Sequence, residues 1–198
     1  MNGSLLALPT SRMLAIKNPW SELVQSLTSL GVVTAIDFIL RVSIGRQKLE
    51  VVAPDGIRLT YDVSTGKAPV SCLEGSHGTP LGWHVIAEKY GDELAEGAVL
   101  DSRKPTGKLY WEYDDWRNRS FVVTRILWLR GLIVGYNSGT DKDGNSCDTY
   151  KRYIYIHGTC HEDAVGRPNS GGCVTLRPRD VIQLYALCPV GTAVLIEL

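Results

Sequence analysis

Apolar residues recur with a helical period near the start of the chain and with a strand period through most of the rest. Within residues 18–31, apolar side chains are spaced three or four residues apart, as on one face of an α-helix. Asn18 is suited to cap this helix, Pro19 to its first turn and Gly31 to its end. The pattern predicts an amphipathic helix that packs against the rest of the domain. Its apolar positions are Trp20, Leu23, Val24, Leu27 and Leu30.

From Ala35 onward the pattern changes to strands. In residues 57–63 apolar and polar side chains alternate, which predicts a half-buried strand. The preceding residues 54–56, Pro-Asp-Gly, predict a turn, because proline presets φ and glycine accepts a positive φ. Residues 177–187 predict a helix, with Cys188 on its buried face. Further strands are predicted at residues 49–52, 82–86, 121–129, 153–156 and 193–198.

The polar segment 88–120 interrupts this pattern, although it contains Tyr110, Trp111, Tyr113 and Trp116. A segment of this length without periodicity is typical of a lid or a binding loop inside a compact domain. It is equally consistent with a solvated hairpin whose aromatic side chains cover the edge of a sheet. Both interpretations stay open, and with either one the chain predicts a mainly β fold.

The length and charge of the chain limit the kinds of protein it can be. Its 198 residues can form one domain with a proper core, or one domain plus a helical extension. The 21 basic and 21 acidic residues balance, which argues against nucleic acid or an anionic membrane as a partner. The longest apolar run, residues 32–40, contains Asp37 and is too short to span a membrane.

The first twenty residues and the cysteines bear on where the protein acts. We expect no secretory signal, and hence a cytoplasmic protein, because polar residues and a proline interrupt the apolar positions of this segment. These are Pro9, Ser11, Arg12 and Lys17. An odd number of cysteines argues against a disulfide framework, and a reducing compartment would keep a catalytic cysteine active. The five are Cys72, Cys147, Cys160, Cys173 and Cys188.

The strongest chemical signal lies in residues 153–176, YIYIHGTCHEDAVGRPNSGGCVTL. A strand-like run leads into His157, and Cys173 follows sixteen residues later at the end of a Ser-Gly-Gly-Cys turn. An imidazole can remove the thiol proton and so activate a cysteine as a nucleophile near neutral pH. The two glycines of the turn allow backbone N–H groups to point at a developing oxyanion. The pattern indicates a cysteine acyltransferase or peptidase.

A metal site is an alternative use of the same residues. His157, Cys160, His161 and Cys173 have the ligand types of a Cys2His2 zinc site. However, Cys160 and His161 are adjacent and the chain has no paired C-x-x-C motif, so the spacing disfavours zinc. We therefore expect no metal and no cofactor. Cys160 and His161 are expected in a loop over the cleft, in contact with substrate.

The block around His157 and Cys173 resembles the catalytic signature of the YkuD-type L,D-transpeptidases, I-H-G-T followed after a spacer by S-x-G-C. The resemblance covers residues 45–198, so we expect a catalytic domain there and an N-terminal extension with one helix in residues 1–44. It implies a compact β-sandwich with a helix beside the active site. Further matching segments are residues 64–66, 79–86 and 180–181, Leu184 and residues 189–196.

Two positions depart from the pattern of that family. Gly171 stands before Gly-Cys where many members have histidine, and Thr175 stands two residues after the cysteine where many have arginine or asparagine. The second difference puts a usual contact with the end of the substrate in question. Arg177 and Arg179 lie close in the sequence and are candidates to replace that contact.

The resemblance implies a role for each residue of the signature. Cys173 would attack an amide carbonyl and form a thioester, while His157 would act first as base and then as acid. The backbone carbonyl of Gly158 would hold the imidazole in one tautomer. The backbone N–H groups of Gly172 and Cys173 would form the oxyanion hole. The expected substrate-binding residues are Ser170, Gly171, Arg152, Tyr155, Thr175 and Arg177, with Arg167 and Arg179 as further candidate partners of substrate carboxylates.

The resemblance also implies the substrate, a murein stem tetrapeptide cut between its third residue, a diamino acid, and the terminal D-Ala. An amine acceptor would give a cross-link, a free D-amino acid would give exchange, and water would give carboxypeptidase activity. The expected cytoplasmic location favours an L,D-carboxypeptidase that trims tetrapeptide to tripeptide in murein recycling. The alternatives are an exported L,D-transpeptidase, a secreted antibacterial effector and a non-catalytic muropeptide-binding domain.

Overall fold

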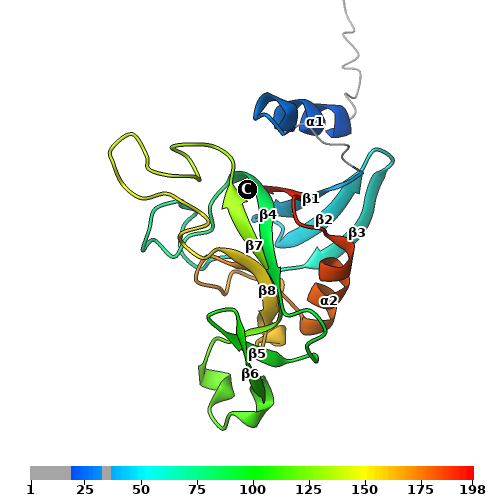
Figure 1. Ribbon diagram of the computed structural model, residues 1–198, viewed down its shortest axis with the longest axis vertical. Coiled ribbons are helices and arrows are strands. Elements are labelled where there is room, and N and C mark those ends of the chain that lie inside the picture. The colour runs from blue at the N-terminus through cyan, green and yellow to red at the C-terminus, as the bar shows by residue number, and fades with distance from the viewer. Residues whose placement is uncertain (1–18, 33–36) are drawn as a thin grey trace, which may run out of the picture.

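The computed structural model describes residues 19–32 and 37–198, and Figure 1 shows the arrangement of their elements. Asn18, the expected helix cap, lies outside the described residues. In chain order the elements are α1 (Pro19–Ser29), β1 (Ile39–Ser43), β2 (Lys48–Ala53), β3 (Gly56–Asp62), β4 (Gly82–Tyr90), β5 (Ala98–Asp101), β6 (Lys104–Leu109), η1 (Tyr110–Glu112), η2 (Trp116–Asn118), β7 (Val122–Gly131), β8 (Tyr155–Thr159), η3 (Glu162–Ala164), β9 (Val174–Leu176), α2 (Pro178–Leu187) and β10 (Ala193–Glu197).

The strands form one strongly curved sheet. Its order is β3-β2-β1-β10-β4-β7-β5-β6, and β8 pairs with the other side of β7 and then with β9. Most neighbours are antiparallel, but β1 runs parallel to β10 and β8 runs parallel to β9. Ser64, just after β3, forms a bridge with Thr175 of β9, so the two ends of the sheet meet. The predicted mainly β architecture is confirmed.

The inner face of the curved sheet encloses the main hydrophobic core. Strands from both halves of the sheet contribute to it, and α2 covers it beside β7 and β8. Val181, Leu184 and Cys188 are fully buried, which confirms the predicted inner face of this helix. Burial of such side chains contributes about 1.5–3 kcal/mol each to the free energy of folding, so the core stabilises β8 and β9.

Helix α1 packs on the outer face of the sheet, above β1 and β2 in Figure 1. Leu27 is fully buried in a second cluster with Ile39, Val52 and Trp83, and the Trp83 Nε1–H donates to Ser26 Oγ at 2.9 Å. The amphipathic helix predicted over residues 18–31 is therefore confirmed. Among the described residues, no helix combines the length and the apolar character needed to cross a membrane.

Three details differ from the expectations. Residues 39–43, which we placed in the N-terminal extension, form β1 between β2 and β10. In β3, Ile57 and Leu59 are 57% and 45% exposed rather than half-buried, because this end of the strand extends past the core. Strand β8 begins at Tyr155, since Tyr153 has a φ of 56° that ends the extended backbone.

The segment 88–120 is largely a hairpin. Strand β5 pairs with β7 through Val99 and Val123, and β6 lies outside it at the lower edge of the sheet in Figure 1. The aromatic residues that follow pack on Val99, Val123 and Cys160. They are Tyr110, Tyr113, Trp116 and Phe121. The hairpin interpretation is thus confirmed, and its aromatic end lies next to β8.

Candidate active site

The parallel pairing of β8 with β9 brings His157 and Cys173 to one face. His157 is aligned with Thr175, so the alternating directions of side chains place Cys173 and Thr175 on the same side as His157. These three residues line a cavity of about 160 Å³, together with Ser170 and Gly171 of the turn before the cysteine. The two residues of the signature, sixteen positions apart in the sequence, therefore meet in one cavity.

His157 is held in one orientation and is uncharged. Its Nδ1 lies 2.8 Å from the carbonyl oxygen of Gly158, as expected, so Nδ1–H donates and Nε2 is left as the acceptor. Burial lowers the pKa of His157 to about 4. Gly158 itself has no room for a side chain, because a Cβ there would lie 2.6 Å from the carbonyl oxygen of Val123. Gly158 thus holds the imidazole of His157 through its carbonyl and allows the close approach of β8 to β7.

Cys173 is also uncharged at neutral pH. Its Sγ lies 3.3 Å from the donating backbone N–H of Tyr155 and 3.6 Å from the carbonyl oxygen of Tyr153. Burial raises the pKa of the Cys173 thiol to about 11, against the opposing effects of the Tyr155 N–H and the positive charge of Arg152. The resting site therefore contains a neutral thiol and a neutral imidazole rather than an ion pair.

The turn before Cys173 is fixed by Ser170. Ser170 Oγ donates to the carbonyl oxygen of Cys173 at 2.5 Å and accepts the N–H of Gly172 at 3.1 Å. Gly172 has a φ of +118°, and a Cβ there would lie 3.0 Å from the carbonyl oxygen of Gly78. Only glycine fits this position. Its N–H, expected in the oxyanion hole, is engaged with Ser170 in this structure.

Of the other expected substrate-binding residues, Thr175 and Tyr155 lie at or beside the cavity. Thr175 lies on the cavity wall, where its backbone N–H donates to the carbonyl of Ser64 at 2.8 Å. The ring of Tyr155 packs edge-on against Trp128, and its hydroxyl accepts from Arg103 Nη1 at 3.1 Å. Tyr155 therefore contributes its backbone N–H to Cys173, while its side chain supports the cavity from the adjacent cluster.

Both arginines expected to bind substrate are used for internal contacts. Arg152 donates from its guanidinium to the carbonyl oxygens of Ser71 and Gly78, at 3.0 and 2.8 Å, and to Ser76 Oγ. Arg177 pairs with Asp62 at 3.3 Å and with Asp180 at 3.7 Å. Neither side chain lines the cavity that holds Cys173. Except for Asp180, their partners are carbonyls, a hydroxyl and a carboxylate from distant segments, which the sequence pattern does not reveal.

Residues 120–122 form part of the cavity wall, and of these only Ser120 lies in the segment for which a binding loop was one expectation. Ser120, Phe121 and Val122 come from the end of the hairpin segment and the start of β7. His161 also lines the cavity, as expected of the loop over the cleft, and its Nε2 lies 2.8 Å from the carbonyl oxygen of Arg119. Cys160 instead is buried against the hairpin. In the sequence, the aromatic residues of segment 88–120 were the only indication that this segment borders the cavity.

The proposed zinc ligands do not converge. Cys160 Sγ lies 3.4 Å from the carbonyl oxygen of Arg119, which also binds His161, while His157 is bound to Gly158. In residues 19–32 and 37–198, no three His, Cys, Asp or Glu side chains are grouped as metal ligands. The arrangement is chemically suited to proton transfer between a thiol and an imidazole beside a polar backbone turn.

The chain is similar to several known proteins. YqjB of Bacillus subtilis (strain 168), whose name places it among the L,D-transpeptidases, is 46% identical over 45 residues, which is 23% of this chain and 26% of YqjB. An L,D-transpeptidase from Mycobacterium smegmatis is 16% identical, with a TM-score of 0.49 over 83% of this chain and 60% of its own. One from Xylanimonas cellulosilytica is 15% identical, with a TM-score of 0.46 over 88% and 69% of the two chains.

One family model matches a range that includes residues of every strand of the sheet. The model of the L,D-transpeptidase catalytic domain, YkuD, matches residues 37–196, from just before β1 to the end of β10. The match includes β1, which lies ahead of the expected boundary at residue 45, and both residues of the signature. The chain therefore belongs to the YkuD family of L,D-transpeptidase catalytic domains.

Proposed function

We propose that the protein is a cysteine-dependent L,D-carboxypeptidase that removes the terminal D-Ala from murein stem tetrapeptides. His157 Nε2 takes the proton of the Cys173 thiol as Sγ attacks the carbonyl carbon of the third residue. The C–N bond then breaks, and His157 returns the proton to the leaving amine of D-Ala. The rest of the peptide stays on Cys173 as a thioester. Water attacks this thioester, with His157 as base, and Cys173 leaves as the thiol.

The observation that carries this proposal is the hydrogen bond between His157 Nδ1 and the Gly158 carbonyl, in the cavity that also holds Cys173. It fixes the tautomer in which Nε2 can accept a proton. A buried, neutral imidazole is also in the protonation state required of a base. Since the thiol is neutral as well, its proton moves to His157 during the attack rather than before it.

The oxyanion formed in this step is assigned to the backbone N–H groups of Cys173 and Gly172. The turn is anchored by Ser170 and by Thr79, whose Oγ1 donates to the Gly172 carbonyl at 2.9 Å. The Gly172 N–H must turn from Ser170 Oγ toward the oxyanion as the negative charge develops, because an N–H group binds an anion more strongly than a hydroxyl.

The choice of water as the acceptor follows from the expected cytoplasmic location, and one observation supports that location. All five cysteines are free thiols in the structure, a state that a reducing compartment maintains. Cross-linking and exchange of D-amino acids use the same thioester, so the acceptor is decided by experiment.

Mass spectrometry of a disaccharide-tetrapeptide after incubation with the enzyme tests the proposal. We expect the loss of one alanine residue with the wild type and none with Cys173→Ala. Cys72→Ala, which removes a partly exposed thiol outside the cavity, is the matched control and should retain activity. Formation of dimers, or incorporation of added D-amino acids, would reassign the protein to transpeptidation. An unchanged peptide would refute the assigned donor. Cell fractionation tests the location separately.

A further inference from the structure

A second hollow adjoins the cavity that holds Cys173. Its volume is about 300 Å³, and it shares Ser120, His161 and Asn169 with that cavity. The remaining wall is rich in basic side chains, which come from three separate segments of the chain. These side chains are Lys67, Arg117 and Arg167. We call this hollow the basic hollow.

The backbone holds these cations close to the catalytic turn. Lys67 follows the bridge between Gly66 and Ser170, and its N–H donates to the Ser170 carbonyl at 3.0 Å. Arg117 lies in η2 at the end of the hairpin segment, with its guanidinium 4.5 Å from the Trp116 ring centroid. The cations are therefore presented by structured segments rather than by a long loose loop.

The basic hollow has an excess of positive charge. Its one carboxylate, Asp163, lies 3.7 Å from Arg167, and the two side chains are 84% and 67% exposed. Such an exposed pair is weak and easily exchanged for another anion. Across the described part of the chain, no ion pair is recorded for Lys67 or Arg117. Two or three cations beside a substrate cavity attract an anionic ligand.

We propose that the basic hollow binds a carboxylate of the donor peptide, on the side of the scissile bond that stays attached to Cys173. This inference rests on the proposed function and names the part of the substrate that the enzyme recognises. In this proposal, a donor with its carbonyl at Cys173 runs upstream along Ser120, His161 and Asn169, which line both hollows. This shared wall leads directly into the basic hollow.

The position of the hollow favours an upstream carboxylate over that of the terminal D-Ala. The D-Ala carboxylate is separated from the scissile bond by one residue, a reach of about 3.6 Å, and in this proposal it stays beside Cys173. The basic hollow lies beyond the shared wall and suits a carboxylate on the second or third residue. It also takes over part of the role that we expected of Arg152 and Arg177, which are engaged elsewhere.

The test compares the double variant Lys67→Met/Arg117→Met with the wild type on two peptides. One is a tetrapeptide with free carboxylates, and the other has the carboxylates upstream of the scissile bond converted to amides. We expect the variant to raise KM for the first peptide about tenfold, with little change in kcat. For the amidated peptide the two enzymes should have the same KM. Arg58→Met removes an exposed cation on β3 and should change neither value.

Two results would overturn the proposal. One is an equal KM for wild type and double variant on the free peptide. The other is a KM increase that persists with upstream amides and disappears when the D-Ala carboxylate is amidated, which would assign the hollow to the leaving group. Calorimetric binding to Cys173→Ala, with and without the double substitution, gives the same comparison without turnover. A failure of the carboxypeptidase reaction therefore remains distinguishable from a failure of this subsite.

Discussion

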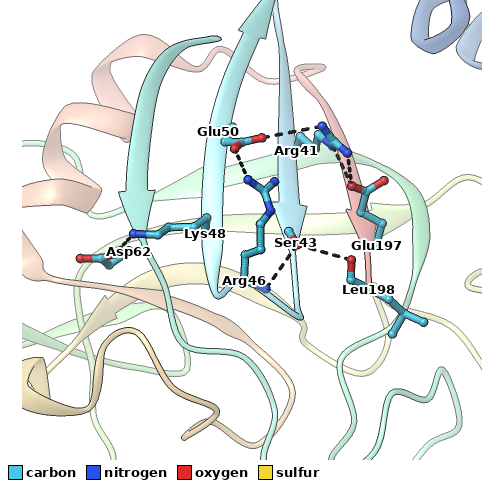
Figure 2. Close-up of polar contacts among 8 residues, drawn as sticks. All are labelled: Arg41, Ser43, Arg46, Lys48, Glu50, Asp62, Glu197 and Leu198. Atoms are coloured by element: carbon cyan, nitrogen blue, oxygen red, sulfur yellow. Dashed lines mark hydrogen bonds and ion pairs between the residues drawn. The ribbon is translucent and has the colours of Figure 1, made fainter. Parts of the chain in front are cut away.

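Glu50 and His157 are buried titratable residues in two regions of the same sheet, the Glu50 cluster and the His157–Cys173 pair. The Glu50 cluster comprises Arg41 on β1, Glu50 on β2, Glu197 on β10 and Arg46 in the turn between β1 and β2 (Figure 2). Glu50 accepts from Arg46 Nη1 at 2.7 Å, and its other oxygen lies 3.9 Å from Arg41 Nη1. The hydrogen bond from Arg46 lowers the pKa of Glu50, so the carboxylate is charged and compensated.

In the His157–Cys173 pair the groups avoid the free-energy cost of a buried charge by being neutral, whereas Glu50 is charged and paired with arginine. Burial dominates both shifts, lowering the pKa of His157 to about 4 and raising that of Cys173 to about 11, so both groups are neutral. In the Glu50 cluster the charged side chains pair with one another and link three strands, although Glu50 Oε2 makes no hydrogen bond with any described residue. In the pair, Cys173 Sγ makes hydrogen bonds only with the backbone of Tyr153 and Tyr155 among the described residues, and His157 is bound through Nδ1 to Gly158. The comparison shows how one sheet separates a polar group used for stability from one poised for chemistry.

Removal of the base should have the largest effect. His157→Gln keeps a polar side chain of similar size but has no titratable nitrogen, so we expect kcat to fall about 10²–10⁴-fold. The control is His84→Gln, which replaces the other buried histidine, bound to Thr149 and Gly82 away from the cavity. This control should lower thermal stability and retain turnover per folded molecule. Similar turnover in His157→Gln and wild type would remove His157 from the mechanism.

Acidification should destabilise the fold through its buried histidines. Burial lowers the pKa of both His84 and His157 from 6.5 to about 4, so the folded state binds fewer protons than the unfolded state between these values. Stability is therefore full above pH 6.5 and is lost as the pH falls, by about 3 kcal/mol per histidine at pH 4. Urea unfolding from pH 7 to 4 measures this slope. A slope unchanged in His84→Gln would contradict the assignment.

Disruption of the Glu50 cluster should lower the stability of the fold and leave the activity unchanged. Glu50→Gln removes the carboxylate that pairs with Arg46, while Arg41 keeps its closer partner Glu197, and we expect a loss of about 1–3 kcal/mol in the free energy of unfolding. The loss stays moderate because both arginines are partly exposed and can regain water. Asp55→Asn, in an exposed pair with Arg58, is the matched control and should be neutral. A Glu50→Gln enzyme with lowered kcat would link the two regions.

Among the substitutions expected to lower kcat, the smallest change is expected at Arg152, which supports the turn before Cys173 through Gly78. Its guanidinium binds the Gly78 carbonyl, which contacts Gly172, and its charge favours the Cys173 thiolate. Arg152→Lys keeps the charge and loses the forked hydrogen bonds, so we expect kcat to fall about tenfold. In Arg152→Met we expect a lower kcat still, and an alkaline limb of the pH–rate profile that lies at higher pH, because the charge that lowers the pKa of Cys173 is lost. Equal profiles for both variants would leave Arg152 a purely structural role.

Much of the fold could be predicted where the pattern reports local burial. Helix α2 was predicted from residues 177–187, and α1 from residues 18–31, because each has one apolar face. Strand β1 was missed as a member of the sheet, since its pairing with β2 and β10 depends on segments far away in the sequence. The exposure of Ile57 and Leu59 was missed for the same reason, because the extent of the core is a property of the whole sheet.

The sequence by itself determined which residues are the candidates for the site. His157 and Cys173, their spacing and the glycines beside them point to a cysteine acyl-transfer site, because these residue types can perform few other reactions together. The role of the Gly158 carbonyl followed from the family resemblance, and the structure contains the expected hydrogen bond.

Only the tertiary structure decided which side chains surround that site. It turned Arg152 and Arg177 toward internal partners, placed Phe121 on the cavity wall, and gathered Lys67 and Arg117 in the neighbouring hollow. It also decided that thiol and imidazole rest uncharged, since a pKa depends on burial and on charges contributed by distant segments. Residue type determines what a group can do, while the packing of remote segments determines its protonation state and its partners.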